Sequence, residues 1–166
     1  MSRQQGQAFI DQASLSHPKW ILAMAGEDEH MSRDLRSDCP IAASLDIIGD
    51  RWTLLVLRDM LLGGKSHFSE FAEDESIATN ILTDRLATLV DQEIIERIPD
   101  PDDGRKYLYR PLPPAIELLP VITELAAWGL KYSSVAPPTD DHPFADPATR
   151  KKLVSQLTRQ LSAGTQ

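Results

Sequence analysis

The sequence has few of the features that identify membrane proteins, secreted proteins and disulfide-rich folds. Among its 166 residues there is one cysteine, Cys39, which cannot form a disulfide within the chain and fits a reducing compartment. No apolar run approaches the roughly 20 residues that span a bilayer, and the opening residues lead into no apolar segment of a secretion signal. These absences predict a soluble, cytoplasmic protein without membrane contact.

The residue spacings of common enzymes and metalloproteins are also absent. Gly63 and Gly64 are not part of a phosphate-binding G-x-x-x-x-G-K loop, and no serine lies in a G-x-S-x-G elbow. The histidines lack the spacing of metal ligands; they are His17, His30, His67 and His142. We therefore expect no enzymatic activity, no cofactor and no metal.

Positive charge is scarce as well. The chain has 17 Lys and Arg against 25 Asp and Glu, a net charge of −8. The deficit persists in the central part, because residues 39–132 contain nine basic and sixteen acidic side chains. Affinity for phosphates comes from a local excess of Lys and Arg, so this composition disfavours a protein that coats DNA. Any DNA-binding surface must be a local patch.

The chain divides into three parts by composition. Residues 1–38 are mostly polar, and we interpret them as an N-terminal extension. Residues 39–132 have the periodic apolar pattern of a folded domain. Pro137 and Pro138 mark a linker near the start of 133–166, which ends in a predicted helix. The apolar face of this helix consists of Leu153, Leu157 and Leu161.

Four helices open the predicted domain. Pro40 suits the first turn of a helix over 40–48, because its missing N–H needs no partner there. A second helix covers 51–62, a short third helix begins at Ser66, and a longer fourth helix covers 78–91. The fourth helix has one apolar face, formed by Leu82, Leu86 and Leu89. A short helix, a tight break and a longer helix are the layout of a helix-turn-helix.

A β-hairpin and a final helix follow. Residues 94–98 and 107–109 predict two strands, and the segment 99–104 between them is rich in turn-forming Pro, Asp and Gly. A last helix over 114–131 is expected to bend at Pro120. Because the hairpin directly follows the helix-turn-helix, we predict a winged helix-turn-helix, a mainly α fold with a small β-hairpin (α+β class).

The domain resembles a known family over residues 39–132. The similarity begins with Cys39–Ile41 and Leu45–Asp59 and continues through later segments in the same order, which are Phe68–Phe71, Ile81–Leu86, Leu119–Val121 and Trp128–Gly129. These segments resemble the HxlR-type transcription regulators of the MarR-like superfamily. The resemblance implies a homodimer formed through the first and last helices. It also implies binding to palindromic operator DNA, with repression expected, and a small-molecule or redox signal that the sequence does not identify.

The fourth helix is the expected recognition helix. The side chains that point away from its leucine face are Asn80, Thr83, Asp84 and Ala87, and Thr79 lies at the start of the helix. Asparagine can pair with adenine and threonine can contact a thymine methyl group; the alternative is an ordinary solvated face. Arg85 lies nearer the buried edge, where its head would reach a phosphate or form an internal ion pair.

The expected wing tip carries two basic residues. Arg105 and Lys106 would contact the DNA backbone or minor groove; the alternative is that they only increase solubility. They stand beside Asp100, Asp102 and Asp103, so the wing is more acidic than a phosphate-contacting loop should be.

A dimer interface is expected because the first and last helices show more apolar surface than one domain core requires. The candidate interface residues are Ile41, Leu45, Leu119, Ile122, Leu125 and Trp128. Cys39 is a candidate redox sensor, since a helix N-terminus favours a reactive thiolate. The nearby acids Asp38, Asp46 and Asp50 oppose that effect, and the alternative is a small half-buried residue at the dimer edge.

A second function remains open from the sequence. The acidic charge also suits a winged-helix module that contacts other proteins without binding an operator. Binding of the chain to its own upstream DNA in the presence of excess competitor would separate the two functions.

Overall fold

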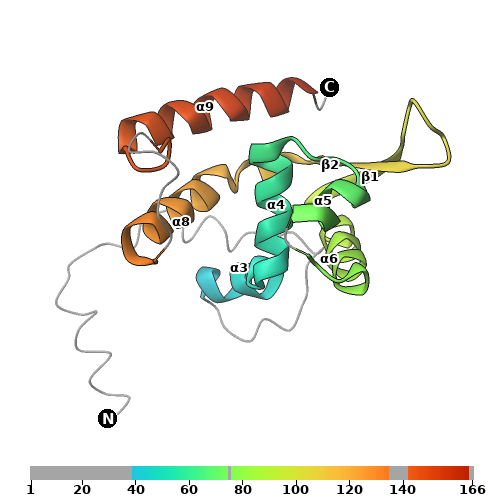
Figure 1. The fold of residues 1–166 in the computed structure, drawn as a ribbon, viewed down its shortest axis with the longest axis horizontal. Coiled ribbons are helices and arrows are strands. Elements are labelled where there is room, and N and C mark those ends of the chain that lie inside the picture. The colour runs from blue at the N-terminus through green and yellow to red at the C-terminus, as the bar shows by residue number, and fades with distance from the viewer. Residues whose placement is uncertain (1–38, 75, 135–141, 165–166) are drawn as a thin grey trace, which may run out of the picture. The chain divides into compact units, whose positions relative to one another are not determined.

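The computed structural model describes residues 39–74, 76–134 and 142–164; the extension expected over 1–38 and most of the expected linker lie outside these residues. The described residues belong to one compact unit that begins at Cys39, and Figure 1 shows its elements. Its helices and strands are α3 (Pro40–Ile48), α4 (Arg51–Gly63), α5 (Phe68–Asp74), α6 (Thr79–Asp91), β1 (Ile95–Pro99), β2 (Tyr107–Pro111), α7 (Pro113–Ile116), α8 (Leu119–Tyr132) and α9 (Pro147–Gly164).

The first two helices begin and end at residues suited to those positions. Pro40 occupies the first turn of α3, where its lack of an N–H costs nothing. Asp50 caps α4, because its carboxylate accepts hydrogen bonds from the backbone N–H groups of Trp52 and Thr53 at 2.9 and 3.1 Å. Gly64 ends α4 with a φ of 69°, a left-handed conformation that glycine adopts at little cost.

The core lies where α4, α6 and the start of α8 meet. The predicted leucine face of α6 is confirmed, since Leu82, Leu86 and Leu89 are all buried. They pack with buried residues of α4 such as Leu57 and with Leu119 of α8. Full burial of one leucine contributes about 1.5–3 kcal/mol, so this cluster fixes α6 firmly against the domain.

The wing is a two-stranded antiparallel hairpin, as predicted. Strands β1 and β2 pair in the register Ile95↔Pro111 to Pro99↔Tyr107. Ile95, at the inner end of β1, is buried and anchors the hairpin, while the turn beyond Pro99 projects away from the helices (Figure 1).

The prediction of one bent helix over 114–131 is wrong. The structure has two helices here, α7 and α8, with a break at residues 117–118. Pro120 lies in the first turn of α8, because inside a continuous helix its ring would clash with the carbonyl of Ile116 and leave that carbonyl without an N–H partner. The proline therefore begins a new helix instead of bending one.

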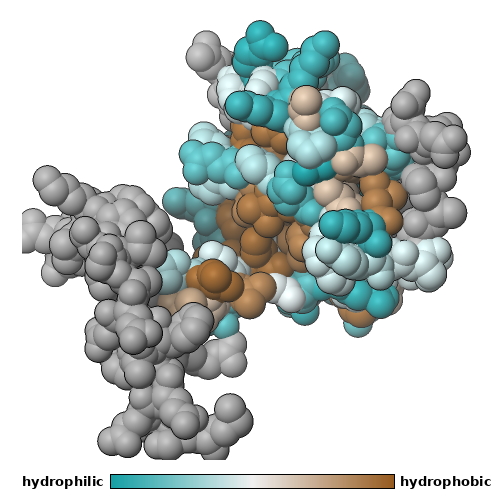
Figure 2. All heavy atoms as spheres, turned by 90° about the vertical axis from the view of Figure 1, so that its left-hand side faces the viewer, coloured by the Kyte–Doolittle hydropathy of each residue, from teal (hydrophilic) through white to brown (hydrophobic). Residues whose placement is uncertain are grey.

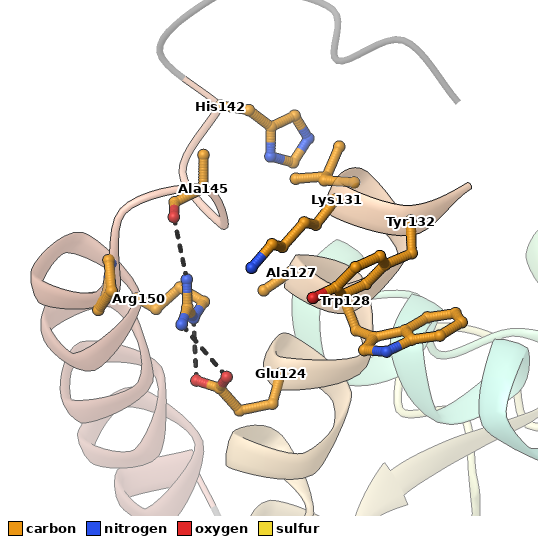
Figure 3. A pocket seen from close by; sticks show the side chains of 10 residues that line it. Glu124, Ala127, Trp128, Lys131, Tyr132, His142, Ala145 and Arg150 are labelled. Atoms are coloured by element: carbon orange, nitrogen blue, oxygen red, sulfur yellow. Dashed lines mark hydrogen bonds and ion pairs between the residues drawn. The ribbon is translucent and has the colours of Figure 1, made fainter. Parts of the chain in front are cut away.

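The C-terminal helix packs on the domain. Val154, Leu157 and Leu161 of α9 are partly buried against the core. Arg150 of α9 forms an ion pair with Glu124 of α8, with Nε–Oε1 at 2.9 Å, and also donates to the Phe144 carbonyl at 2.6 Å. Figure 3 shows this pair on one wall of a pocket between α8 and α9. No helix of the described residues is long and apolar enough to cross a membrane.

Candidate nucleic-acid interface

Helix α6, the expected recognition helix, presents a polar face away from its buried leucines. Thr79, Asn80, Thr83 and Asp84 are all exposed. The Thr83 hydroxyl donates to the Thr79 carbonyl at 2.7 Å, so this hydroxyl is engaged within the helix and its methyl group is left to meet a ligand. Asn80 is thus the exposed side chain of this face with the best chemistry for reading a base edge.

Arg85 lies beside this face and turns toward the domain. Its Nε lies 3.4 Å from the Asp50 carboxylate and its Nη2 lies 3.7 Å from that of Asp84. Of the two roles expected for Arg85, a phosphate contact or an internal ion pair, this geometry corresponds to the internal ion pair. It connects α6 to the N-terminus of α4.

The ion pair and the capping hydrogen bonds together lower the pKa of Asp50. Partial burial raises the pKa of Asp50, but hydrogen bonds from Thr53 and Trp52 and the Arg85 guanidinium outweigh that effect. The pKa therefore lies below its usual value, and Asp50 is a carboxylate at neutral pH.

The wing tip carries Arg105 and Lys106 at its surface, as expected from the sequence. Both side chains are exposed, and both reach Asp103, with Arg105 Nε at 3.1 Å and Lys106 Nζ at 3.6 Å from its carboxylate oxygens. Hydrogen bonds from Arg105 and the charge of Lys106 hold the pKa of Asp103 below its usual value. One acid is therefore shared by two bases, and with Asp100 and Asp102 the segment 100–106 contains three acidic and two basic side chains.

A third basic residue of the wing was not predicted. Arg97 on β1 is exposed and its guanidinium lies 3.7 Å from the ring centre of Tyr107 on β2. The hairpin register brings this basic residue and this aromatic residue close together across the strands. The pair cannot be identified from the sequence until that register is known.

The candidate dimer surface is only partly as expected. Leu119 and Ile122 are buried in the core of their own chain, so they are not part of an exposed interface. Ile41 and Leu45 of α3 are exposed, and so is a stripe along α8. That stripe consists of Val121, Leu125, Trp128 and Tyr132.

Val121 and Tyr132 were missed although they lie at helical spacing from Leu125 and Trp128. Figure 2 shows apolar side chains gathered on the side of the molecule where α3 and α8 lie. An apolar groove of about 370 Å³ between α4 and α8, lined in part by Leu54, Leu125 and Phe144, continues this surface. We call the exposed residues of α3 and the α8 stripe the α3–α8 face.

Cys39 lies at the N-cap position of α3 and is exposed. It makes no side-chain capping hydrogen bond to that helix. Its thiol lies two residues before Ile41 and therefore close to the α3–α8 face.

The elements described so far define a winged helix-turn-helix, in which α6 presents an exposed polar face and the wing tip exposes Arg105 and Lys106. Residues 47–136 match the HxlR-like helix-turn-helix family, and the chain belongs to this family. The resemblance and the fold class expected from the sequence are thus confirmed. The family is one of DNA-binding transcription regulators and not of enzymes.

Individual relatives agree with this assignment. The HTH-type transcriptional regulator Rv3095 of Mycobacterium tuberculosis is 32% identical over 92 residues, which are 55% of this chain and 58% of that protein. The match therefore spans less than two thirds of the relative. The solved structure of PA1607 has a TM-score of 0.57 at 32% identity and covers 63% of this chain and 72% of its own. The redox regulator HypR in its oxidized form has a TM-score of 0.53 at 28% identity, with 58% and 100% covered.

Proposed function

We propose that this chain is a cytoplasmic transcription regulator that binds a palindromic operator as a homodimer and acts as a repressor. The observation that carries the proposal is the geometry of α6, which buries its leucines, points Asn80, Thr83 and Asp84 away from them and exposes Thr79 at its start. A helix fixed in this way can lie in the major groove with its polar side chains at the base edges.

The wing supplies contacts of a different kind. Arg105, Lys106 and Arg97 are exposed on the hairpin and suit the phosphate backbone, which attracts positive charge whatever the base sequence. The rest of the domain is acidic, so non-specific affinity is expected to be low, with a salt dependence set by the few phosphate contacts of the wing.

The α3–α8 face supports a homodimer. Its large apolar side chains include Trp128, which is 62% exposed, and Ile41, which is 70% exposed. A cluster of this kind on a monomer marks an interaction surface, and a second copy would cover it with the same face. Two α6 helices would then read half-sites about 10 bp apart, or a multiple of that distance.

Fluorescence anisotropy with DNA fragments from the region upstream of the chain's own gene tests operator binding. We expect specific binding that survives excess competitor DNA and a mass of two chains by sedimentation at micromolar concentration. Trp128→Glu should give monomers and weaken operator binding, whereas Ser155→Ala, at an exposed position of α9, should change neither. If no fragment binds at any salt, the protein–protein module suggested by the acidic charge is the better proposal.

We further propose that Cys39 gives the regulator a redox response. The thiol is exposed at the start of α3, and HypR, which the fold resembles, is named as a redox regulator. Oxidation would join two Cys39 thiols across the dimer, with two electrons and two protons passing to the oxidant, or would add a polar oxygen beside the interface.

Wild type and Cys39→Ser, each treated with diamide, hydrogen peroxide and a quinone, test the redox proposal. We expect both proteins to bind DNA when reduced, and only wild type to change its affinity on oxidation. An equal response of the two proteins would assign Cys39 the alternative role of a small residue at the dimer edge.

A further inference from the structure

A partly buried hydrogen-bonded pair, His67 and Asp100, joins the helix-turn-helix to the wing. The Asp100 side chain is only 10% exposed, although it belongs to the wing turn, and its Oδ2 lies 2.9 Å from Nε2 of His67. His67 directly precedes α5, and the two residues are 33 positions apart in the sequence. Asp100 thus points inward to the helix-turn-helix and not outward to solvent.

The histidine is held in place by neighbouring hydrogen bonds. The Glu70 carboxylate accepts from the backbone N–H groups of His67 and Ser66 at 2.7 and 2.8 Å. The Ser66 carbonyl in turn accepts from the backbone N–H of Tyr109 at 2.8 Å, and His67 forms an isolated bridge with Leu108 of β2. The backbone before α5 is therefore fixed both to α5 and to the wing.

The aspartate organises the wing tip from the other side. Its Oδ1 accepts from the backbone N–H of Asp102 at 2.8 Å, and its own N–H donates to the Lys106 carbonyl at 3.0 Å. A change in the position of Asp100 would therefore be passed directly to Lys106 and to the adjacent Arg105.

We propose that His67 and Asp100 are positioning residues that hold the wing against the helix-turn-helix, so that Arg105 and Lys106 meet the DNA backbone while α6 occupies the groove. This inference rests on the proposed DNA binding. It explains why an acidic residue stands in a wing that must approach phosphates. The carboxylate is used inside the protein to set the direction of the wing.

The charged surroundings of His67 give the pair a pH dependence. Glu70 faces the ring from α5, with its Oε2 3.4 Å from Nδ1. Across a hollow of about 610 Å³, the groups of the wing that face it are Arg97, Arg105, Lys106, Tyr107 and Tyr109. The hydrogen bond to Asp100, together with the charges of Glu70 and Asp100, raises the pKa of His67 above its ordinary value of 6.5.

The sign of the effect follows from linkage. A raised pKa means that the folded wing favours the protonated imidazole, so the pair contributes fully below pH 6.5 and loses its charged form as the pH rises through the pKa in the folded protein. Wing-dependent DNA binding should therefore weaken across that range.

A double-mutant cycle between His67 and Arg105 tests the proposal. Arg105→Ala alone is expected to lower operator affinity about threefold to tenfold at low salt. In a His67→Gln background the same change should cost less than about twofold, because a wing that is no longer held in place already makes few phosphate contacts. Lys152→Ala, at an exposed position of α9, is the matched control; made in both backgrounds, it should have no effect in either.

The pH dependence of operator affinity is the second measurement. A purely structural role of His67 would leave this dependence unchanged. Between pH 6 and 8, wild-type affinity should fall more steeply than that of His67→Gln; His17, His30 and His142 remain in both proteins, so the difference reports His67. Asp100→Asn should behave as His67→Gln does. Circular dichroism and thermal melting establish that each variant is folded.

Each outcome decides the inference. Equal effects of Arg105→Ala in both backgrounds, with parallel pH profiles, would overturn the positioning role and leave the proposed function intact. Absence of specific binding by wild type would refute the proposed function and the inference together. If both His67→Gln and Asp100→Asn fail to fold, the pair serves folding and not the placement of the wing.

Discussion

The recognition helix and the wing are held in place by different forces. Helix α6 is fixed by Leu82, Leu86 and Leu89, each at most 1% exposed, and apolar burial depends little on pH or salt. The wing beyond Ile95 is fixed by strand pairing, by Tyr109 packed against the core and by the His67–Asp100 pair. Salt screens the charges of this pair, and a rising pH removes the proton of His67. The helix expected to read bases should therefore keep its position over a wide range of salt and pH. The position of the wing, which is expected to meet phosphates, should depend on both.

The largest effect should come from breaking the apolar support of α6. Leu86→Ala leaves a cavity in the core and is expected to destabilise the fold by about 2–5 kcal/mol. Leu108→Ala in the half-buried strand β2 removes the same atoms and is expected to cost about 1 kcal/mol or less, since less area leaves water. Urea denaturation measures both. Equal costs would mean that the wing is as tightly packed as α6.

A smaller effect is expected at the exposed face of α6. Asn80→Ala should reduce the discrimination between operator and random DNA by about 1–3 kcal/mol, because a base contact is lost and the fold is untouched. Thr88→Ala, farther along α6, is the control. An equal loss of affinity for operator and random DNA would contradict a base-reading role for Asn80.

The polar connection between α6 and α4 should contribute less again. Asp50→Ala removes the cap of α4 and the partner of Arg85, and is expected to cost about 0.5–2 kcal/mol. Asp50→Asn keeps a good capping side chain and loses only the charge, so it should cost less than Asp50→Ala.

This contribution should also depend on pH in a known direction. The pKa of Asp50 is lowered in the folded protein from 3.8, so its stabilisation is complete at neutral pH and is lost as the pH falls below 3.8 through the folded value. Thermal melting of wild type and Asp50→Asn between pH 7 and 3 measures this. The two melting temperatures should converge at the acid end, and a gap that stays constant would exclude a role for the charge.

Much of the fold could be predicted from the sequence because its signals are local. Pro40, Gly64 and the leucine period of α6 act within one helix, so the ends of α3 and α6 were predicted to within one residue. The break before Pro120 was missed because an apolar period alone does not distinguish a bent helix from two helices.

The candidate site was harder to predict, because its decisive features are tertiary. Leu119 and Ile122 have the same apolar character as Leu125, and only packing shows that the first two face the core. The inward turn of Asp100 depends on His67, far away in the sequence. The residue pattern around His67 and the pattern around Asp100 give no indication that these two side chains meet.

The smallest expected effect concerns the wing tip itself. Arg105 is 90% exposed and shares Asp103 with Lys106, so its removal should leave stability unchanged, since exposed ion pairs contribute about 0–1 kcal/mol. Arg105→Ala should weaken binding to operator and random DNA alike and reduce the slope of log affinity against log salt by about one. Arg159→Ala is the control, because it removes an equal charge from α9, outside the wing and α6. It should leave the slope unchanged. Asp103→Asn provides the opposite change, because it releases both bases from a shared acid and should raise affinity for all sequences. If neither Arg105→Ala nor Asp103→Asn moves the salt slope, the wing tip makes no phosphate contact, and the recognition helix alone carries DNA binding.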